Sequence, residues 1–183
     1  MENAGRGGQA FSGYLKIKKQ PAPQFKTLSD GLNPARSQDK ENHMDYPALL
    51  AILQQHANPE RAVPMQAYMK HRFAYFGIGK PELARLCRPF LKDAAKQPVD
   101  WDFVRRCWDD PHRELQYAAL EYLKKMQQHL TPQDIPRLQT LITEKSWWDS
   151  ADVLDRIVGG IALRHPEVNA VLLAWSTDDN IWL

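Results

Sequence analysis

Apolar residues recur every three or four positions from Met44 onward, which is the spacing of one face of an α-helix. Four stripes of this kind are Leu115, Ala118, Ala119, Tyr122, Leu123 and Met126; Ile135, Leu138, Leu141 and Ile142; Val153, Ile157 and Ile161; and Val168, Val171, Leu172 and Trp175. No segment alternates apolar and polar residues with the period of two that is typical of a strand. The pattern therefore predicts an all-α fold.

Proline marks the start of several of these helices. Asn58, Asp110 and Thr131 each precede a proline. Each pair places a side-chain acceptor at the N-cap and proline at the first helical position, where no backbone N–H is needed. With the stripes, these signals predict helices over 47–57, 59–73, 81–96, 100–109, 111–129, 132–144, 147–164 and 166–176. Pro64 and Pro89 fall inside two of these ranges, where we expect a late start, a kink or a break.

The loops between these helices are short, so we expect neighbouring helices to be antiparallel. Repeated helix pairs of this length favour an α-α superhelix, a solenoid of HEAT-like antiparallel helix pairs. No residue signature repeats along the chain, and a compact irregular bundle is the competing fold. The last residues, Asp178-Asp179-Asn180 followed by Ile181-Trp182-Leu183, resemble the first turn of another helix. Because this end is apolar, we expect the domain to be incomplete at its C-terminus.

Composition divides the 183 residues near residue 44. The first 43 hold 5 of the 9 Gly, 7 of the 24 Lys and Arg, 4 acidic residues and none of the 6 Trp. Their net charge is +3, and the remainder of the chain carries −1, for a total of +2. We expect residues 1–43 to be a disordered extension or a leader added for expression; a functional basic arm is the alternative. Residues 44–183 form the predicted folded domain.

Several protein classes are excluded or disfavoured by the sequence. The longest stretch without Lys, Arg, Asp or Glu, residues 46–59, is too short and too polar for a membrane helix, and the N-terminus has no apolar signal region. Cys87 and Cys107 are too few for a disulfide scaffold and fit buried positions in a reducing compartment. No Cys/His spacing resembles a zinc site, and no phosphate-binding glycine loop or nucleophile elbow occurs. We therefore expect a cytoplasmic protein without metal or membrane association.

The densest unusual segment is Lys-Ser-Trp-Trp-Asp-Ser-Ala-Asp, residues 145–152. Ser146 fits the N-cap of the helix that follows, and Asp149 would complete a capping-box-like arrangement. Asp152 lies beyond the first turn and shares a helix face with Trp148, four residues earlier. An aromatic plate beside a carboxylate suits a cationic ligand with a flat or sugar-like body. The alternative is that both tryptophans are core residues and that Asp152 pairs with Arg156.

A second group of aromatic and basic residues runs from Met65 to Ile78, across the end of the predicted helix 59–73. Phe73, Tyr75, Phe76 and Ile78 fit core packing around a bend at Gly77. The residues with polar or basic reach are Tyr68, Lys70, His71 and Arg72.

Together these segments resemble the AlkD-type DNA alkylation-repair glycosylases. The pieces that carry the resemblance are Asn58-Pro-Glu-Arg61, Tyr68-Met-Lys70, Phe76-Gly-Ile78, Lys145-Ser-Trp-Trp-Asp-Ser-Ala-Asp152, His165-Pro-Glu167 and Asp179-Asn-Ile-Trp-Leu183. The resemblance covers residues 44–183. It implies a HEAT-like solenoid whose concave face holds duplex DNA, and hydrolysis of the N-glycosidic bond of cationic alkylated purines such as 3-methyladenine and 7-methylguanine. It implies a monofunctional enzyme that leaves an abasic site and needs no cofactor.

Carried over by position, the resemblance makes Asp152 the catalytic carboxylate, Trp148 an aromatic wall against the deoxyribose and Tyr68 a further site residue. Family members also use an arginine soon after the Trp-Leu pair and a later tryptophan, whereas this sequence ends at Leu183. For DNA binding, cations must neutralise phosphates although residues 44–183 carry a net −1. We therefore expect a subset of cations to gather on one face: Lys70, Arg72, Lys80, Lys145 and Arg156.

The chemistry of such a reaction fits a carboxylate beside an indole. An alkylated purine is already cationic and leaves as a neutral base, so positive charge develops on the sugar. A carboxylate in a water-poor groove stabilises that charge and can position the attacking water. Two alternatives remain open: a non-catalytic DNA-structure-binding protein or inactive fragment, and a helical-repeat protein that binds other proteins. We expect a monomer that acts on bacterial, nucleoid-associated DNA.

Overall fold

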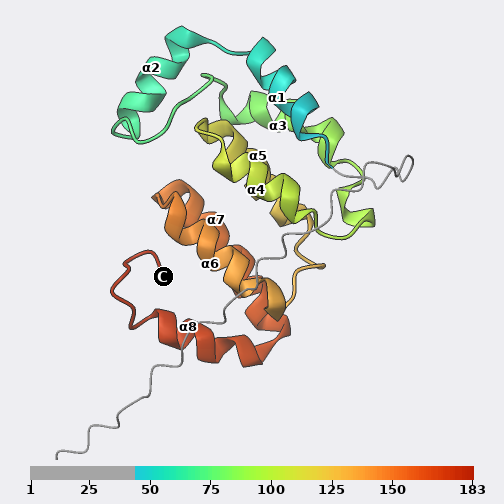
Figure 1. Cartoon of the computed structure of the whole chain (residues 1–183), viewed down its shortest axis with the longest axis vertical. Coiled ribbons are helices and arrows are strands. Elements are labelled where there is room, and N and C mark those ends of the chain that lie inside the picture. The colour runs from blue at the N-terminus through green and yellow to red at the C-terminus, as the bar shows by residue number, and fades with distance from the viewer. Residues whose placement is uncertain (1–43) are drawn as a thin grey trace, which may run out of the picture. The chain divides into compact units, whose positions relative to one another are not determined.

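Eight α-helices and three short 3-10 helices follow one another in residues 44–183, the part of the chain that the computed structural model describes (Figure 1). The α-helices are α1 (Tyr46–Gln55), α2 (Pro59–Tyr68), α3 (Lys80–Leu91), α4 (Trp101–Asp109), α5 (Arg113–Lys125), α6 (Ile135–Glu144), α7 (Trp148–Arg164) and α8 (Asn169–Trp175). The 3-10 helices are η1 (Ala94–Lys96), η2 (Pro132–Asp134) and η3 (Pro166–Val168). The expectation that residues 1–43 are disordered lies outside this range.

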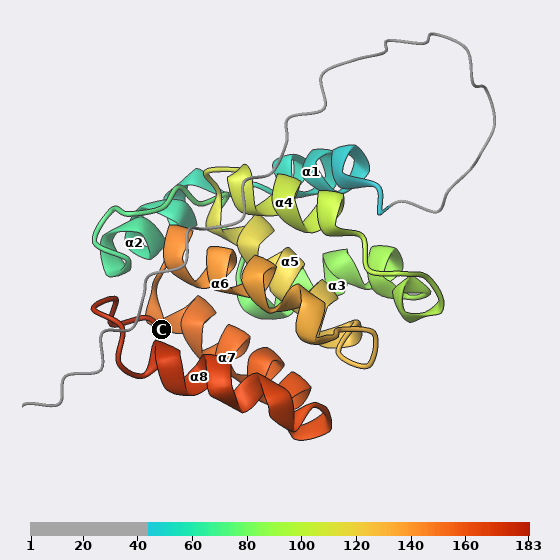
Figure 2. The same cartoon turned by 60° about the horizontal axis from the view of Figure 1, so that its bottom comes forward.

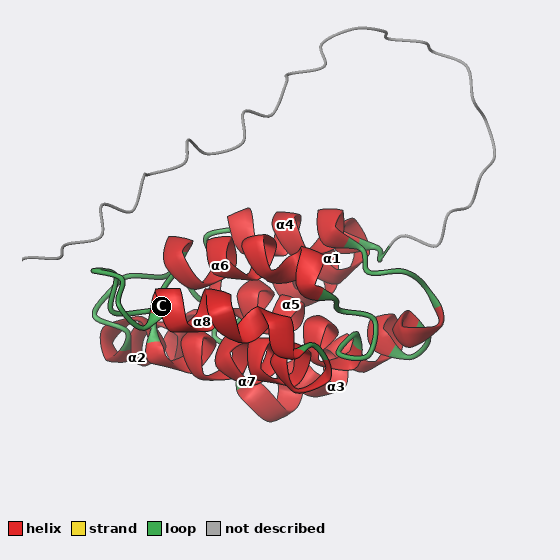
Figure 3. Ribbon diagram, turned by 90° about the horizontal axis from the view of Figure 1, so that it is seen from below, coloured by secondary structure: helices red, strands yellow, loops and turns green. Residues whose placement is uncertain are grey.

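The helices of residues 44–183 are stacked largely in the order of the sequence, from α1 at one end to α8 at the other (Figures 1 and 2). Helix α5 packs against α3, α4 and α7, and α7 also packs against α6. Figure 3 shows α4 and α6 in one layer and α3 and α7 in the other. This arrangement is that of an α-α solenoid, so the predicted all-α fold class is confirmed.

The predicted apolar stripes form most of the core. All members of the α5 and α6 stripes are buried, and Ile157 and Ile161 continue the core into α7. The α8 stripe is divided, since Val168 and Trp175 are buried whereas Val171 is 41% exposed. No helix in residues 44–183 is long and apolar enough to cross a membrane.

The cap predictions are right at two of three prolines. Asn58 accepts a hydrogen bond from the Arg61 N–H at 3.0 Å, and Thr131 forms a capping box at η2. The prediction that Asp110 caps the next helix is wrong, because α5 begins at Arg113 with His112 at its N-cap. The Asp110 carboxylate instead accepts from the His112 N–H at 2.8 Å, which makes a turn before the helix.

The two internal prolines do not break their helices, since α2 continues through Pro64 and α3 through Pro89. The predicted helix after Asp178 does not form in the described residues. Residues 177–183 make turns, and the Asn180 N–H donates to the Asp178 carboxylate at 2.8 Å.

Candidate functional site

The start of α7 is fixed by a fully buried arginine on α5. Arg113 donates to the Asp149 carboxylate at 2.5 Å and to Ser150 Oγ at 2.7 Å. A third bond, of 3.1 Å, goes to the carbonyl oxygen of Lys145, just before α7. Its guanidinium also lies 4.0 Å from the centroid of the Phe73 ring. One buried cation therefore ties α5, the segment before α7 and the first turn of α7 together.

The capping-box prediction for this segment is wrong. The Ser146 hydroxyl donates back to the Ile142 carbonyl oxygen at 2.5 Å at the end of α6, and Trp147 occupies the N-cap of α7. Asp149 does not cap the helix, because its carboxylate is taken by Arg113 and by the hydroxyl of Tyr117. A tertiary ion pair has replaced the local bond that the sequence pattern indicated.

The loop between α2 and α3 is held by a second buried charge on α5. Glu114 is fully buried, and its carboxylate accepts three backbone N–H groups at 2.9–3.1 Å, those of Phe76, Gly77 and Ile78. Gly77 has φ +89°, and a Cβ there would lie 2.1 Å from the Asn58 carbonyl oxygen. The predicted bend at Gly77 is confirmed, and only glycine fits it.

A pocket of 620 Å³ lies between the end of α2, this loop and the starts of α5 and α7. Its lining is mainly aromatic and basic: Met65, Tyr68, Met69, Lys70, Tyr75, Lys80, Tyr117, Trp147, Trp148 and Asp149. We call it the aromatic pocket. Residues from four helices, α2, α3, α5 and α7, and from the loops beside them build it, so no single sequence segment encodes it.

Two tyrosines at the base of the aromatic pocket are neutral donors. Tyr117 donates to the Asp149 carboxylate, and Tyr75 Oη lies 3.2 Å from Tyr117 Oη. Burial, and then the hydrogen bond to Asp149, raises the pKa of Tyr117 well above its usual value. Burial also raises the pKa of Tyr75. The Asp149 carboxylate at the pocket wall thus accepts hydrogen bonds from Arg113 and Tyr117, and its role there is structural.

The two aromatic residues named from the sequence both line the aromatic pocket. Trp148 is 65% exposed and Tyr68 is 83% exposed, which is unusual for large aromatic side chains. Trp148 makes an edge-on contact with Trp182, with ring centroids 4.9 Å apart. Trp147 is partly buried and packs against a small core cluster that contains Met69 and Tyr75. The adjacent tryptophans thus do not both enter the core.

Asp152 lies on the same face of α7 as Trp148, one turn further along. It is exposed, and within residues 44–183 its carboxylate has no hydrogen bond and no ion pair. The alternative that Asp152 pairs with Arg156 is wrong, because the described part of the chain contains no such contact. Asp152 does not belong to the lining of the aromatic pocket. It is a free carboxylate beside that pocket.

The basic residues named from the sequence gather only in part. Lys70 and Lys80 line the aromatic pocket, and the Arg72 guanidinium lies 4.9 Å from the centroid of Trp147, on its face. Lys145 precedes α7 and lines a neighbouring pocket together with Arg72. Arg156 is exposed on α7 two turns beyond Trp148 and belongs to neither pocket.

Sequence reasoning missed the residues that hold the site in place, notably Arg113, Glu114 and Tyr117. The sequence did contain a signal for Arg113 and Glu114. Two adjacent charged residues begin a helix whose remaining residues are largely apolar, which indicates that both charges are buried with it. Within residues 44–183, no group of three His, Cys, Asp or Glu side chains is arranged to hold a metal ion.

Comparison with known proteins is consistent with this geometry. No curated protein matches the chain. Among solved structures, a predicted DNA alkylation repair enzyme from Enterococcus faecalis is similar, with a TM-score of 0.62 and 28% identity over 69% of this chain. The matched region spans 61% of the length of that protein. A sequence profile described as DNA alkylation repair enzyme matches residues 49–183, which is most of the chain. The chain therefore belongs to the DNA alkylation repair enzyme family.

Proposed function

We propose that residues 44–183 form a HEAT-like DNA-glycosylase domain that hydrolyses the N-glycosidic bond of cationic alkylated purines in duplex DNA. In this proposal Asp152 is the catalytic carboxylate, and Trp148 and Tyr68 are the aromatic walls that contact the substrate. The enzyme is monofunctional and leaves an abasic site in an intact strand. It acts as a monomer, without a cofactor, on DNA in the bacterial cytoplasm.

The observation that carries the proposal is the free state of Asp152 beside an exposed aromatic wall. Asp149, the carboxylate that lines the aromatic pocket, is already engaged by Arg113 and Tyr117. Asp152 alone follows Trp148 by one turn on the same helix face without a partner in residues 44–183. A carboxylate without a resident cation is available to a cation that forms in the substrate.

The reaction gives both residues a role. As the bond between sugar and base lengthens, the alkylated base takes the bonding electrons and leaves neutral, while C1′ of the deoxyribose becomes cationic. The Asp152 carboxylate would stabilise that charge electrostatically and orient a water molecule for attack at C1′. The face of Trp148 would add about 0.5–2 kcal/mol through its quadrupole.

The cations near the pocket support duplex DNA as the partner. Lys70 and Lys80 line the aromatic pocket and Arg72 lies on Trp147, and none of the three has an ion pair in residues 44–183. Phosphate neutralisation dominates nucleic-acid affinity, so a local cluster suffices even where the domain as a whole is slightly acidic.

The test of this function is the release of free base from alkylated duplex DNA. The protein should release 7-methylguanine and leave abasic sites. Trp148→Ala should lower the rate roughly 2- to 30-fold, which corresponds to the loss of about 0.5–2 kcal/mol. Leu163→Ala, at an 87% exposed position of the same helix, is the matched control and should leave the rate unchanged. DNA binding without any base release would favour the non-catalytic alternative instead.

A further inference from the structure

A second pocket of 540 Å³ lies beside the aromatic pocket. It is lined by Arg72, Phe73, Ala74, Pro111, Thr143, Glu144, Lys145, Ser146 and Trp182. We call it the basic pocket. Two contacts join the linings of the two pockets, since Arg72 of the basic pocket lies on Trp147 of the aromatic pocket and Trp182 of the basic pocket contacts Trp148. A DNA strand whose sugar rests on Trp148 would therefore continue past Trp182 into the basic pocket.

Arg72 brings a positive charge with unused donors to the basic pocket. The side chain is exposed, and its only recorded contact in residues 44–183 is with the Trp147 ring. The Arg72 side chain donates no hydrogen bond to an acceptor within residues 44–183, so the five N–H groups of its guanidinium are available to a ligand. Those donors have the fork geometry that matches phosphate oxygens. The contact with the Trp147 ring places the Arg72 guanidinium beside the aromatic pocket.

Lys145 brings a second positive charge to the basic pocket. Its ammonium donates to the carbonyl oxygen of Asp110 at 2.5 Å, which uses one of three donors. The side chain is half-buried, and burial lowers the pKa of the ammonium from its usual value. A half-buried ammonium with two donors to spare gains from an anion that enters the pocket.

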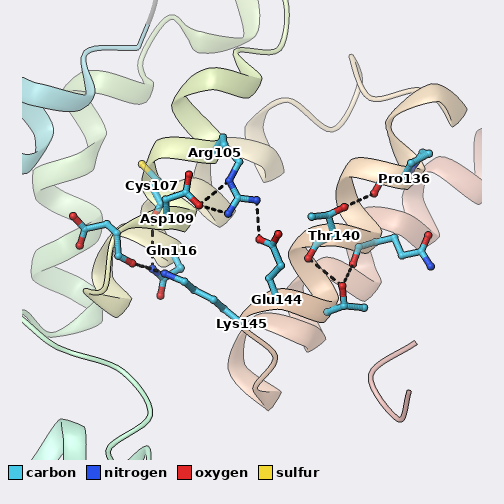
Figure 4. Close-up of polar contacts among 11 residues, drawn as sticks. Arg105, Cys107, Asp109, Gln116, Pro136, Thr140, Glu144 and Lys145 are labelled. Atoms are coloured by element: carbon cyan, nitrogen blue, oxygen red, sulfur yellow. Dashed lines mark hydrogen bonds and ion pairs between the residues drawn. The ribbon is translucent and has the colours of Figure 1, made fainter. Parts of the chain in front are cut away.

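Two acidic residues near the basic pocket, Glu144 and Asp109, are both paired with Arg105, which offsets one of their two negative charges (Figure 4). Glu144 lines the pocket, but its carboxylate accepts from Arg105 Nη1 at 2.7 Å. Asp109 also pairs with Arg105, which lowers the pKa of Asp109. Figure 4 shows Glu144 turned toward Arg105 while Lys145 extends toward the end of α4.

We propose that the basic pocket binds one phosphodiester group of the DNA strand whose sugar rests against Trp148, with Arg72 and Lys145 as its two cationic ligands. The proposal rests on the proposed function for the identity of the partner. The shared chemistry is that of a phosphate anion, and a free phosphate ion is the other possible source. The contacts of Arg72 with Trp147 and of Trp182 with Trp148 favour the phosphodiester, because they join the basic pocket to the aromatic pocket.

The test measures the salt dependence of binding to a short undamaged duplex, so that it does not depend on base release. Each phosphate contact contributes about 0.9 to the slope of log K against log salt. If Arg72 and Lys145 share one phosphate, the double variant Arg72→Gln/Lys145→Gln should lower that slope by about 0.9. Arg72→Gln alone should lower it by less, because Lys145 remains on the same phosphate.

The matched control is Lys125→Gln, which also removes one positive charge. Lys125 is exposed and unpaired in the described range, and it ends α5, whereas Arg113 begins that helix near the basic pocket. The two ends are about 18 Å apart at 1.5 Å per residue. The control should leave the slope unchanged. Because Lys145 also holds the Asp110 carbonyl oxygen, thermal unfolding is recorded for each variant, and Arg72→Gln provides a readout without that contact.

Two results would overturn the proposal. A double variant with the slope of Lys125→Gln would mean that no phosphate lies in the basic pocket. A decrease of about 1.8 would mean that the two cations contact separate phosphates. In a second arm, inorganic phosphate is titrated while tryptophan fluorescence is followed. Saturation that needs Arg72, with a DNA slope that does not, would assign the pocket to free phosphate. If the double variant lowers the salt slope by about 0.9 but the protein releases no 7-methylguanine, the proposed function is overturned. The proposal that the basic pocket binds a phosphodiester would then still hold.

Discussion

Replacement of Arg113 by methionine tests whether one buried cation holds the start of α7. Arg113 has no exposed surface and bonds to three groups at that point, the Asp149 carboxylate, Ser150 Oγ and the Lys145 carbonyl oxygen. Methionine fills much of the same volume but donates no hydrogen bond. The variant therefore removes the ion pair and leaves the packing mostly intact.

The size of the effect follows from what the substitution leaves behind. Removal of one partner of a buried ion pair costs about 3–5 kcal/mol. The Asp149 side chain is 18% exposed and keeps the bond from Tyr117, so it is not fully stranded. We therefore expect a loss near the low end, about 3 kcal/mol. In a domain of this size, that corresponds to a decrease in Tm of about 10 °C.

Substitution of the other partner of the ion pair, Asp149, should lower the free energy of unfolding further. Asp149→Asn leaves the Arg113 guanidinium fully buried without an anion, and we expect a loss of about 4–5 kcal/mol. The double variant Arg113→Met/Asp149→Asn should cost at least about 2 kcal/mol less than the sum of the two single losses. Urea unfolding of all four proteins gives the coupling free energy. Losses that add within about 0.5 kcal/mol would show that the pair does not act as a unit and would refute the reasoning.

Three further perturbations probe the loop and the first helix. Glu114→Gln should destabilise the chain by about 2–3 kcal/mol in urea unfolding, because the amide nitrogen cannot accept the backbone N–H groups that the carboxylate accepts. Gly77→Ala should cost more than about 1 kcal/mol in the same assay, and an unchanged midpoint would be inconsistent with φ +89°. Burial and the hydrogen bond to Asp110 raise the pKa of Tyr46 to about 12. Because this folded-state value lies above the unfolded value of about 10, the stabilisation is complete below pH 10 and is lost as pH rises through 12. The free energy of unfolding of Tyr46→Phe should therefore fall less steeply between pH 10 and 12 than that of the unaltered protein.

The helices could be predicted from the sequence because their signals are local. Apolar spacing gave α1, α4, α6 and α7 to within two residues at most ends, and the cap before proline at Asn58 marked the start of α2. The errors arose where a tertiary contact replaced a local one. Ser146 and Asp149 have the spacing of a capping box, yet the buried Arg113 draws Asp149 into an ion pair and Ser146 bonds back to α6.

The candidate site was predictable only at its exposed residues. Trp148 and Asp152 share a helix face by spacing alone, and the structure keeps both exposed. The aromatic pocket could not be predicted, because Tyr68, Tyr117 and Trp148 come from three helices whose contact depends on the fold. Spacing also cannot reveal which acids are neutralised, which is why the contrast between Asp149 and Asp152 emerged only from the contacts.

The most direct measurement is the single-turnover rate constant for 7-methylguanine release by Asp152→Asn and by Asp155→Asn. Both residues are exposed on α7 and lack an ion pair in residues 44–183, so the two variants change the net charge equally. Loss of an electrostatic stabiliser of the transition state lowers rates roughly 10²- to 10³-fold. We expect that decrease for Asp152→Asn only, with duplex binding retained by both variants. Equal rate constants for the two variants would contradict the assignment of Asp152 as the catalytic carboxylate.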